Sequence, residues 1–445
     1  MTRQMTTGNP AKQIVFFAIP LLIGNLFQQL YNIADTFIVG RTIGVHALAA
    51  VGSTGSLIFL IFGFAMGVSN GVSMITAQRF GAGDEAGVRR SVATSAWIGL
   101  FTSIVLSAIG VPLTRPILEL MRTPADIIDD AHSYLVVIFA GIAALMLFNL
   151  LANAIRALGD SKTPLIFLAI ACVLNIILNY ILILGFGMGV GAVAWGTVIA
   201  QLASSLMCIW YIKKKLPMLH LKKEDWKLTK ADFILHARIG IPMGFQTSII
   251  GMGAVVLQFV LNGLGALAVA AFTAAIRIEQ IMMLPLMSFG MTMGTYSAQN
   301  YGAGKLDRIK KGVFQCVIIA VSIAIVGGIT SILFGYQIAA VFVGREMTEV
   351  LVMAQTYLRI SGTFLWILAL LFVFRFTLQG LGKGVAPLFS GAMELGARVF
   401  AALFLVGSFG FVGVSWASPL AWIGAAAPLM IMYFVTMRKL TQERM

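Results

Sequence analysis

One carboxylate, Asp35, lies within an apolar stretch near the start of the chain, and no base stands three or four residues from it. If this stretch spans a membrane, the charge costs roughly 2.5–3.5 kcal/mol to insert, so the acid is expected to have a function. Such a carboxylate could take up a proton, or it could hold Na⁺ as a hard oxygen ligand. Gln28 and Asn32 share its helical face, and Pro20 would bend the helix. We predict a cation-coupling site at Asp35; the alternative is a purely structural acid.

Oxygen-bearing side chains at helical spacing occur in two later apolar stretches. Asn175 and Asn179 are four residues apart and therefore share a face, and Thr197 follows in the next stretch. Amides and hydroxyls often join neighbouring membrane helices by hydrogen bonds, which is one interpretation. The other is that these three residues and Asp35 together enclose a small cation such as Na⁺.

Two further acids lie in apolar stretches of the second half of the chain. Glu394 and Arg398 are four residues apart, so we interpret them as a structural ion pair. Glu279 and Arg277 are two residues apart and point in different directions, so each needs a partner elsewhere. Arg375 could reach the membrane surface or pair with one of these acids. These residues could line a polar, charged cavity in the second half of the chain. The sequence leaves open whether such a cavity takes part in transport or only stabilises the fold.

The elements that carry these residues follow from the composition. Of 445 residues, 59% are hydrophobic and 11% are charged, and the mean hydropathy is +0.94. Soluble domains are roughly 45–50% apolar and about 25% charged, so this chain is expected to lie in a membrane. The net charge of +14 does not indicate a nucleic-acid partner, because the bases lie in short loops between apolar stretches. The three cysteines have no paired spacing and are interpreted as packing residues: Cys172, Cys208 and Cys316.

Twelve stretches are long enough to cross a bilayer, which takes about 18 or more apolar residues. They cover residues 12–39, 47–77, 91–113, 131–157, 164–186, 190–212, 237–262, 267–298, 312–336, 351–379, 385–407 and 411–437. Of the 31 bases, 23 fall on one side of these spans and five on the other, so the positive-inside rule predicts cytoplasmic termini. We therefore expect an all-α, multi-pass protein of the cell membrane, with a first span that is retained instead of being cleaved as a signal peptide.

The sequence also contains an internal repeat. Ala77-Gln78-Arg79-Phe80-Gly81-Ala82-Gly83 recurs 221 residues later as Ala298-Gln299-Asn300-Tyr301-Gly302-Ala303-Gly304. Other pairs at spacings of 221–223 are Pro20 with Pro242, Leu158-Gly159 with Leu381-Gly382, Pro164 with Pro387, and Trp195 with Trp416. Each half has six spans, so the halves share one orientation in the membrane. We predict a six-helix lobe at 1–212, a basic cytoplasmic linker at 213–236 and a second six-helix lobe at 237–445.

The repeated Gly-Ala-Gly segment is interpreted as a tight turn between helices, anchored by the bases that follow it. A phosphate-binding loop would require a preceding strand or a Gly-Lys-Ser/Thr ending, and neither occurs. No ATPase motif is visible, so an ion gradient is the expected energy source. We expect no enzyme activity and no cofactor apart from the coupling ion, Na⁺ or H⁺.

These motifs together resemble the multidrug and toxic compound extrusion (MATE) transporters, in particular the DinF-like branch of the MOP flippase superfamily. The resemblance rests on the paired Ala-Gln-x-Phe/Tyr-Gly-Ala-Gly segments, Ala34-Asp35-Thr36, Arg277-Ile278-Glu279, and Leu158-Gly159-Asp160 before Pro164. It covers essentially the whole chain, and the set is specific although each motif alone is weak. The resemblance implies two six-helix lobes that form a V around a central cavity and export amphipathic, often cationic drugs.

The resemblance also assigns residues. Asp35 falls on the coupling acid of that branch, Pro20 on its bending proline, and Asn175 and Thr197 on its cation site. The chain departs at Asn179, where many relatives carry a second acid, so either H⁺ coupling through Asp35 alone or a weaker Na⁺ site is expected. The seventh span reads Gln246-Thr247-Ser248-Ile249-Ile250 and lacks the acid of the NorM-like branch, which argues against a second cation site.

The function expected is therefore drug export in exchange for Na⁺ or H⁺ by alternating access, carried out by a functional monomer among membrane lipids. The alternative is a flippase for lipid-linked precursors, which would favour a strongly cationic cavity. Only three bases remain inside spans after those assigned to the two sides, namely Arg277, Arg375 and Arg398, so the flippase is less favoured. A channel or receptor without coupled transport is a third, weaker reading, because a duplicated scaffold suits rocking between two states.

Overall fold

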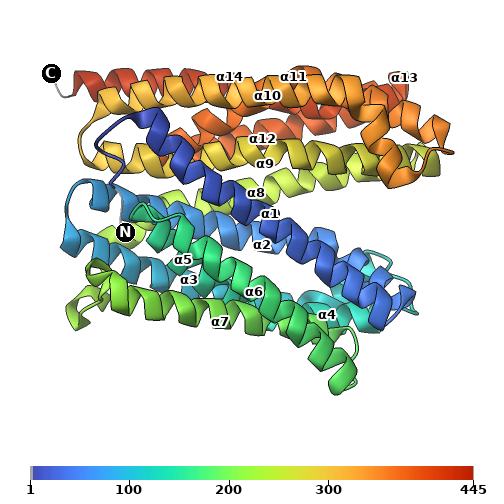
Figure 1. The fold of residues 1–445 in the computed structure, drawn as a ribbon, viewed down its shortest axis with the longest axis horizontal. Coiled ribbons are helices and arrows are strands. Elements are labelled where there is room, and N and C mark those ends of the chain that lie inside the picture. Colours follow the sequence, from blue (N-terminus) through green and yellow to red (C-terminus); the bar gives the residue numbers. More distant parts are fainter. Residues whose placement is uncertain (1–3, 444–445) are drawn as a thin grey trace. The chain divides into compact units, whose positions relative to one another are not determined.

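The computed structural model describes residues 4–443, and within them it contains helices and loops without strands (Figure 1). The α-helices are α1 (Pro10–Thr42), α2 (Val45–Gly81), α3 (Glu85–Leu120), α4 (Ile128–Ala140), α5 (Ile142–Ala157), α6 (Lys162–Tyr180), α7 (Gly191–Lys215), α8 (Lys230–Asn262), α9 (Ala266–Gly302), α10 (Leu306–Val343), α11 (Thr348–Gly380), α12 (Val385–Phe400), α13 (Val406–Phe409) and α14 (Phe411–Gln442). Two π-helical segments, η1 (Ile181–Gly185) and η4 (Ala401–Leu405), continue α6 and α12, and two short 3₁₀ turns, η2 (Pro217–Leu219) and η3 (Lys223–Trp226), precede α8. Arg3 and Arg444, two of the bases that favour cytoplasmic termini, lie outside the described residues.

The expected number of membrane spans is confirmed when one bent pair is counted as a span. Among the described residues, 11 helices are individually long and apolar enough to cross a membrane. The pair α4 and α5 passes the same test together, with a bend of 45° between them. The bend lies at Gly141, where an added Cβ would collide with Val198 of α7, so the glycine permits close packing there. The fold class is thus all-α, with up to twelve spans.

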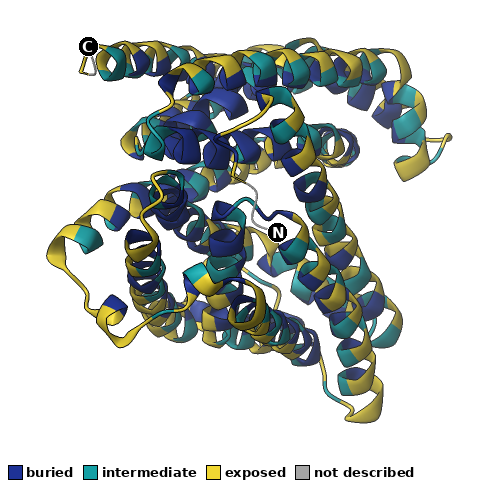
Figure 2. Cartoon of the chain, turned by 60° about the vertical axis from the view of Figure 1, so that its left-hand side comes forward, coloured by how far each residue is buried: buried dark blue, intermediate teal, exposed yellow. Residues whose placement is uncertain are grey.

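The helices carry buried residues on one side and exposed residues on the other (Figure 2). Many of the exposed residues are large and apolar, for example Phe101, Ile104 and Leu206, which are 57–66% exposed. In a soluble protein so much exposed apolar surface would mark a binding site or an aggregation hazard. On helices of membrane-spanning length it is the surface that lipid covers.

Contacts divide the chain into two units that do not coincide with the expected ranges. Unit 1 takes in Pro20–Gly244, and unit 2 takes in Met5–Ile19 together with the chain from Phe245 onward. The expected linker at 213–236 and the first part of α8 therefore group with unit 1, and the first ten residues of α1 group with unit 2. Helix α1, the first helix of the N-terminal half, thus starts in unit 2, and α8, the first helix of the C-terminal half, starts in unit 1. The changes fall at Pro20 and just after Pro242, which are repeat-related prolines.

The second copy of the repeated motif holds the segment that precedes α1 within unit 2. Asn300 donates from Nδ2 to the carbonyl oxygen of Met5 over 3.1 Å, and Lys305 donates from Nζ to that of Thr6 over 2.9 Å. The Arg308 guanidinium donates to the carbonyl oxygen of Gly8 over 2.8 Å. These contacts satisfy backbone acceptors that would otherwise have no partner before the helix starts.

The first copy of the motif holds the start of α8 within unit 1 in a corresponding way. Arg79 forms an ion pair with Asp232 in the first turn of α8. One turn further on, His236 is fully buried, and its Nε2 lies 2.7 Å from the Ser91 hydroxyl. An added Cβ at Gly71 of α2 would lie 2.6 Å from the Cα of Gly240, so the two helices touch through glycine.

The repeated motif also forms the tight turn expected from its glycines. Gly83 and Gly304 have φ angles of 75° and 74°, the left-handed region that favours glycine. The sequence predicted this turn, but it did not reveal that each copy also fastens the first helix of the opposite half, through Arg79 in one copy and through Asn300 with the nearby Lys305 and Arg308 in the other.

Candidate functional site

The predicted cation-site residues are positioned by α1, α6 and α7, all within unit 1. Asn175 and Asn179 occupy successive turns of α6, and both are fully buried. The π-helical segment η1 begins two residues after Asn179. Such segments insert an extra residue into a helical turn and often accompany functional sites, because they rotate the preceding side chains relative to those that follow.

Asp35 is half-buried, and its carboxylate accepts a hydrogen bond from Asn179. The distance between Asn179 Nδ2 and Asp35 Oδ1 is 2.7 Å. The amides that share the helical face of Asp35 in the sequence are not its partners, since Gln28 and Asn32 are exposed and form no hydrogen bond with it in residues 4–443. The structure thus joins α1 to α6 through the predicted acid and one of the predicted amides.

Asn175 and Thr197 complete the group of four predicted residues. Amide orientations are assigned from their surroundings, and the orientation that satisfies both ends of Asn175 donates to Asp35 Oδ1 over 2.8 Å. In this orientation the Asn175 oxygen accepts from the Tyr31 hydroxyl over 3.0 Å. That hydroxyl also lies 3.0 Å from Thr197 Oγ1. Tyr31 was not predicted, although its position one turn before Asp35 could have indicated it.

A second residue that the sequence did not reveal is Gly196, which makes room for the α6 amides. An added Cβ at this position would collide with Asn179 Oδ1 and would lie 3.4 Å from Asn175 Nδ2. Asn179 Oδ1 is buried and has no hydrogen-bond partner in the described part of the chain. The absence of a side chain at Gly196 is therefore what allows Asn179 to face Asp35.

The chemistry of this group suits a small, hard cation or a proton. It brings together one carboxylate, two amides and two hydroxyls, and such oxygen donors are those that hard cations prefer. In the described residues no three or more His, Cys, Asp or Glu side chains gather into a metal site. The amide NH₂ groups now face the carboxylate, so a bound Na⁺ would require the amides to turn their oxygens inward. A proton on Asp35 Oδ2 would require no such turn, because Oδ1, which accepts from both amides, can go on accepting.

Glu394 of unit 2 lies between two arginines. It forms an ion pair with Arg375 of α11, and its second oxygen lies 3.6 Å from Arg398 one turn along α12. Arg375 also donates to the Ser390 hydroxyl over 2.9 Å. The contact expected from the spacing of Glu394 and Arg398 is present, but Arg375 is the nearer base. Glu394 and Arg375 are both 4% exposed, so each charge depends on the other for its stability in the membrane.

Glu279 and Arg277 point apart as their spacing requires, with Glu279 buried and Arg277 exposed. Glu279 lies beside the Tyr357 and Ser361 hydroxyls of α11 and within electrostatic reach of Arg398, and its Oε2 has no hydrogen-bond partner among the described residues. Glu279, Glu394, Arg375 and Arg398 therefore form one connected group of two acids and two bases.

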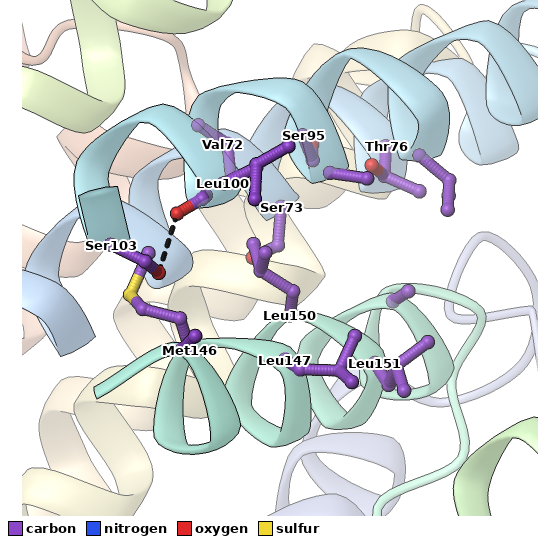
Figure 3. A pocket seen from close by; sticks show the side chains of 15 residues that line it. Val72, Ser73, Thr76, Ser95, Leu100, Ser103, Met146, Leu147, Leu150 and Leu151 are labelled. Atoms are coloured by element: carbon purple, nitrogen blue, oxygen red, sulfur yellow. Dashed lines mark hydrogen bonds between the residues drawn. The ribbon is translucent and has the colours of Figure 1, made fainter. Parts of the chain in front are cut away.

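A pocket of about 240 Å³ lies elsewhere in unit 1, between α2, α3 and α5 (Figure 3). Its lining combines leucines of α5 with hydroxyls of α2 and α3. These hydroxyls bond to their own helices, since Ser73 donates to the carbonyl oxygen of Asn70 and Ser103 to that of Gly99, both over 2.7 Å. With its hydroxyls already satisfied, the pocket offers an apolar surface and lacks the carboxylate that the Asp35 site has.

The chain has up to twelve spans and a duplicated scaffold, and a polar group lies between its helices. These features are those of a multi-pass membrane protein of the transporter class. The MatE family model matches the chain twice, at residues 20–181 and 242–404, so each half contains one copy of the family's unit. The chain belongs to the MatE family, whose members are transporters and not enzymes. The two matches start at Pro20 and Pro242, as the repeat predicts.

Individual proteins agree with this assignment. The chain is 33% identical over 308 residues, 68% of each chain, to the probable multidrug resistance protein YpnP of Bacillus subtilis. It is 25% identical over 440 residues, 97% of this chain and 95% of the other, to the multidrug export protein MepA of Staphylococcus saprophyticus. The solved outward-facing structure of a multidrug resistance MATE family transporter matches 99% of both chains with a TM-score of 0.89 at 24% identity, which shows a shared fold.

Proposed function

We propose that the protein is a secondary active multidrug efflux antiporter that exports amphipathic or cationic compounds in exchange for Na⁺ or H⁺ by alternating access. The observation that carries this proposal is the Asp35 carboxylate held by the neutral Asn179 amide. When such an acid binds a proton or a cation, the net charge of its site changes, because no base compensates it. The names of relatives such as MepA, a multidrug export protein, supply the substrate class.

Coupling requires that the ion and the drug favour different conformations, since a ligand shifts an equilibrium only by its differential affinity. Helix α1 offers a route for this coupling. It carries Asp35 and Pro20, and the unit to which its residues belong changes at Pro20. A proline inside a helix removes one backbone hydrogen bond and allows a bend there. Ion binding that alters the contacts of Asp35 would therefore change the bend of α1.

We further propose that the protein functions as a monomer in the cell membrane. Both termini would lie in the cytoplasm, and lipid would surround the spans. The basic loops support this orientation through the positive-inside rule. The flippase alternative is less favoured, because Arg375 and Arg398 already contact Glu394 and Arg277 is exposed.

The test is transport of a fluorescent cationic dye by the purified protein in proteoliposomes, under an imposed Na⁺ gradient or an imposed pH gradient. We expect one of the two gradients to move the dye in the wild type and to fail in Asp35→Asn, which keeps the shape of the side chain but not its charge. Asn32→Ala, which changes an exposed residue of the same helix, is the matched control and should retain transport.

The outcomes separate the two candidate functions. Dye movement against its own gradient by Asp35→Asn, at the wild-type rate, would overturn Asp35 as the coupling residue. Dye movement under neither gradient in the wild type would overturn the antiporter and favour a flippase, to be tested with a fluorescent lipid-linked pyrophosphate.

A further inference from the structure

A groove of about 640 Å³ lies on unit 2, lined by residues near the start of α10, near the end of α14 and from α11. Its floor is aromatic, because Phe374 and Tyr433 are 5% and 4% exposed and their ring centroids lie 5.2 Å apart. Its walls include Phe314 and Phe434, which are 67% and 60% exposed. The groove is therefore an open, apolar depression on a surface that itself exposes large apolar side chains.

The mouth of the groove is basic. Lys310 and Arg438 line it from opposite helices, and no residue of the lining is acidic. Lys310 lies 3.8 Å from Asp307, which is fully exposed, so this contact is weak and leaves the ammonium group accessible. Arg438 forms no hydrogen bond or ion pair within residues 4–443. Two cations of this kind at the end of membrane helices match the charge of an anionic headgroup.

A third feature points to a ligand inside the groove. Tyr433 is almost completely buried, yet its hydroxyl forms no hydrogen bond with any described residue. The oxygen is not one of the fully buried atoms, so the hydroxyl remains accessible from the groove and can donate to a molecule that binds there. Tyr433 lies five residues before Arg438, or about 7.5 Å deeper along the helix. An ester carbonyl of a lipid bound at Arg438 lies at this depth, between headgroup and acyl chain.

We propose that this groove binds one anionic phospholipid. Its phosphate lies between Lys310 and Arg438, an ester carbonyl accepts the hydrogen bond of Tyr433, and an acyl chain follows the aromatic walls. A cationic drug does not fit this site, because both charges at the mouth repel it. The proposal concerns a lipid site on unit 2 and is independent of the ion coupled at Asp35.

The experiment is native mass spectrometry of the full-length protein in detergent, titrated with phosphatidylglycerol or with phosphatidylcholine of the same acyl chains. We expect the wild type to retain phosphatidylglycerol in preference to phosphatidylcholine. Replacing both bases in Lys310→Gln/Arg438→Gln should weaken phosphatidylglycerol binding about thirty-fold. The control, Lys223→Gln/Lys227→Gln, removes two exposed bases of the linker and should bind like the wild type.

A second variant keeps the test decisive if the double variant does not fold. Tyr433→Phe removes one hydroxyl only, and it should weaken both lipids by about two- to ten-fold because both carry the ester carbonyl. Equal binding of the two lipids by the wild type, or equal binding of phosphatidylglycerol by the double variant and the control, would overturn the proposal. Detection of a protein dimer in place of the lipid complex would also overturn the proposal, because the groove would then be an interface between two copies.

Discussion

The Asp35 site in unit 1 and the corresponding positions of the repeat in unit 2 carry side chains of different chemical type. The spacings of the repeat carry Tyr31 to Gly253, Asp35 to Leu257, and Asn175 to Arg398. An added Cβ at Gly253 would lie 2.9 Å from the Cδ of Arg398, so the missing side chain at this glycine makes room for the arginine. Where unit 1 has an acid among amides, unit 2 has a base beside acids.

One duplicated scaffold thus holds an acid with neutral partners in unit 1 and an acid with basic partners in unit 2. In unit 1, Asp35 depends on neutral partners and can accept a proton or a cation without losing an ion pair. In unit 2, Glu394 is held by Arg375 and Arg398, and a cation that entered there would face two guanidinium groups. We therefore expect substitutions in unit 1 to affect transport and those in unit 2 to affect stability.

The largest effect is expected from Asp35→Leu, which copies Leu257 of unit 2. Gradient-driven dye transport should fall to the level of empty vesicles, because the exchangeable charge is gone. The thermal unfolding temperature should stay the same or rise, since a half-buried acid is replaced by an apolar side chain. Asn32→Leu makes the same exchange for an exposed amide on the same helix and should transport normally. Coupled transport by Asp35→Leu would remove the functional contrast between the two units.

A large loss of stability is expected from Glu394→Gln, which removes the buried ion-pair partner of Arg375. Removing one partner of a buried ion pair costs about 3–5 kcal/mol, so the unfolding temperature measured in detergent should fall clearly. Glu349→Gln, at an exposed acid in the first turn of α11, is the control and should unfold like the wild type. If Glu394→Gln unfolded like its control, the charges of unit 2 would not be structural.

A smaller effect is expected from Gly196→Ala, which copies Ala417 of unit 2. The added methyl group collides with Asn179, and overpacking of this kind costs about 1–3 kcal/mol. Because the collision displaces the amide that holds Asp35, the concentration of the coupling ion for half-maximal transport should change. Gly424→Ala, where nothing lies within 4 Å of the added Cβ, should leave it unchanged. Identical ion dependence in both variants would contradict the role given to Gly196.

The smallest effects are expected at Thr197, whose repeat-related partner is Ser418. Thr197→Ser keeps the hydroxyl and should leave ion dependence unchanged, whereas Thr197→Val loses it. A typical net contribution of one hydrogen bond is about 0.5–1.5 kcal/mol, so the valine variant should bind the ion about two- to ten-fold more weakly. Transport titrations over the ion concentration would show the difference. If Thr197→Val matched Thr197→Ser, the hydroxyl would not belong to the ion site.

Part of the candidate site could be predicted from the sequence because its residues obey local rules. Asp35 stood out as an acid without a base at helical spacing, and Asn175 and Asn179 stood out as amides one turn apart. The partner of Asp35 could not be assigned in this way. Gln28 and Asn32 share its helical face but are exposed, and the amide that meets it comes from a helix 144 residues away.

The sequence by itself determined the helical spans, the duplication and the candidate residues for ion coupling, because hydropathy and helical spacing are properties of neighbouring residues. The tertiary structure alone decided that Tyr31 and Gly196 join the Asp35 site, that Arg375 is the nearer base to Glu394, and that α1 and α8 each begin in the opposite unit. These features depend on how each helix is rotated and where it packs. Helix rotation and packing arise from many contacts between distant segments, which no local pattern encodes.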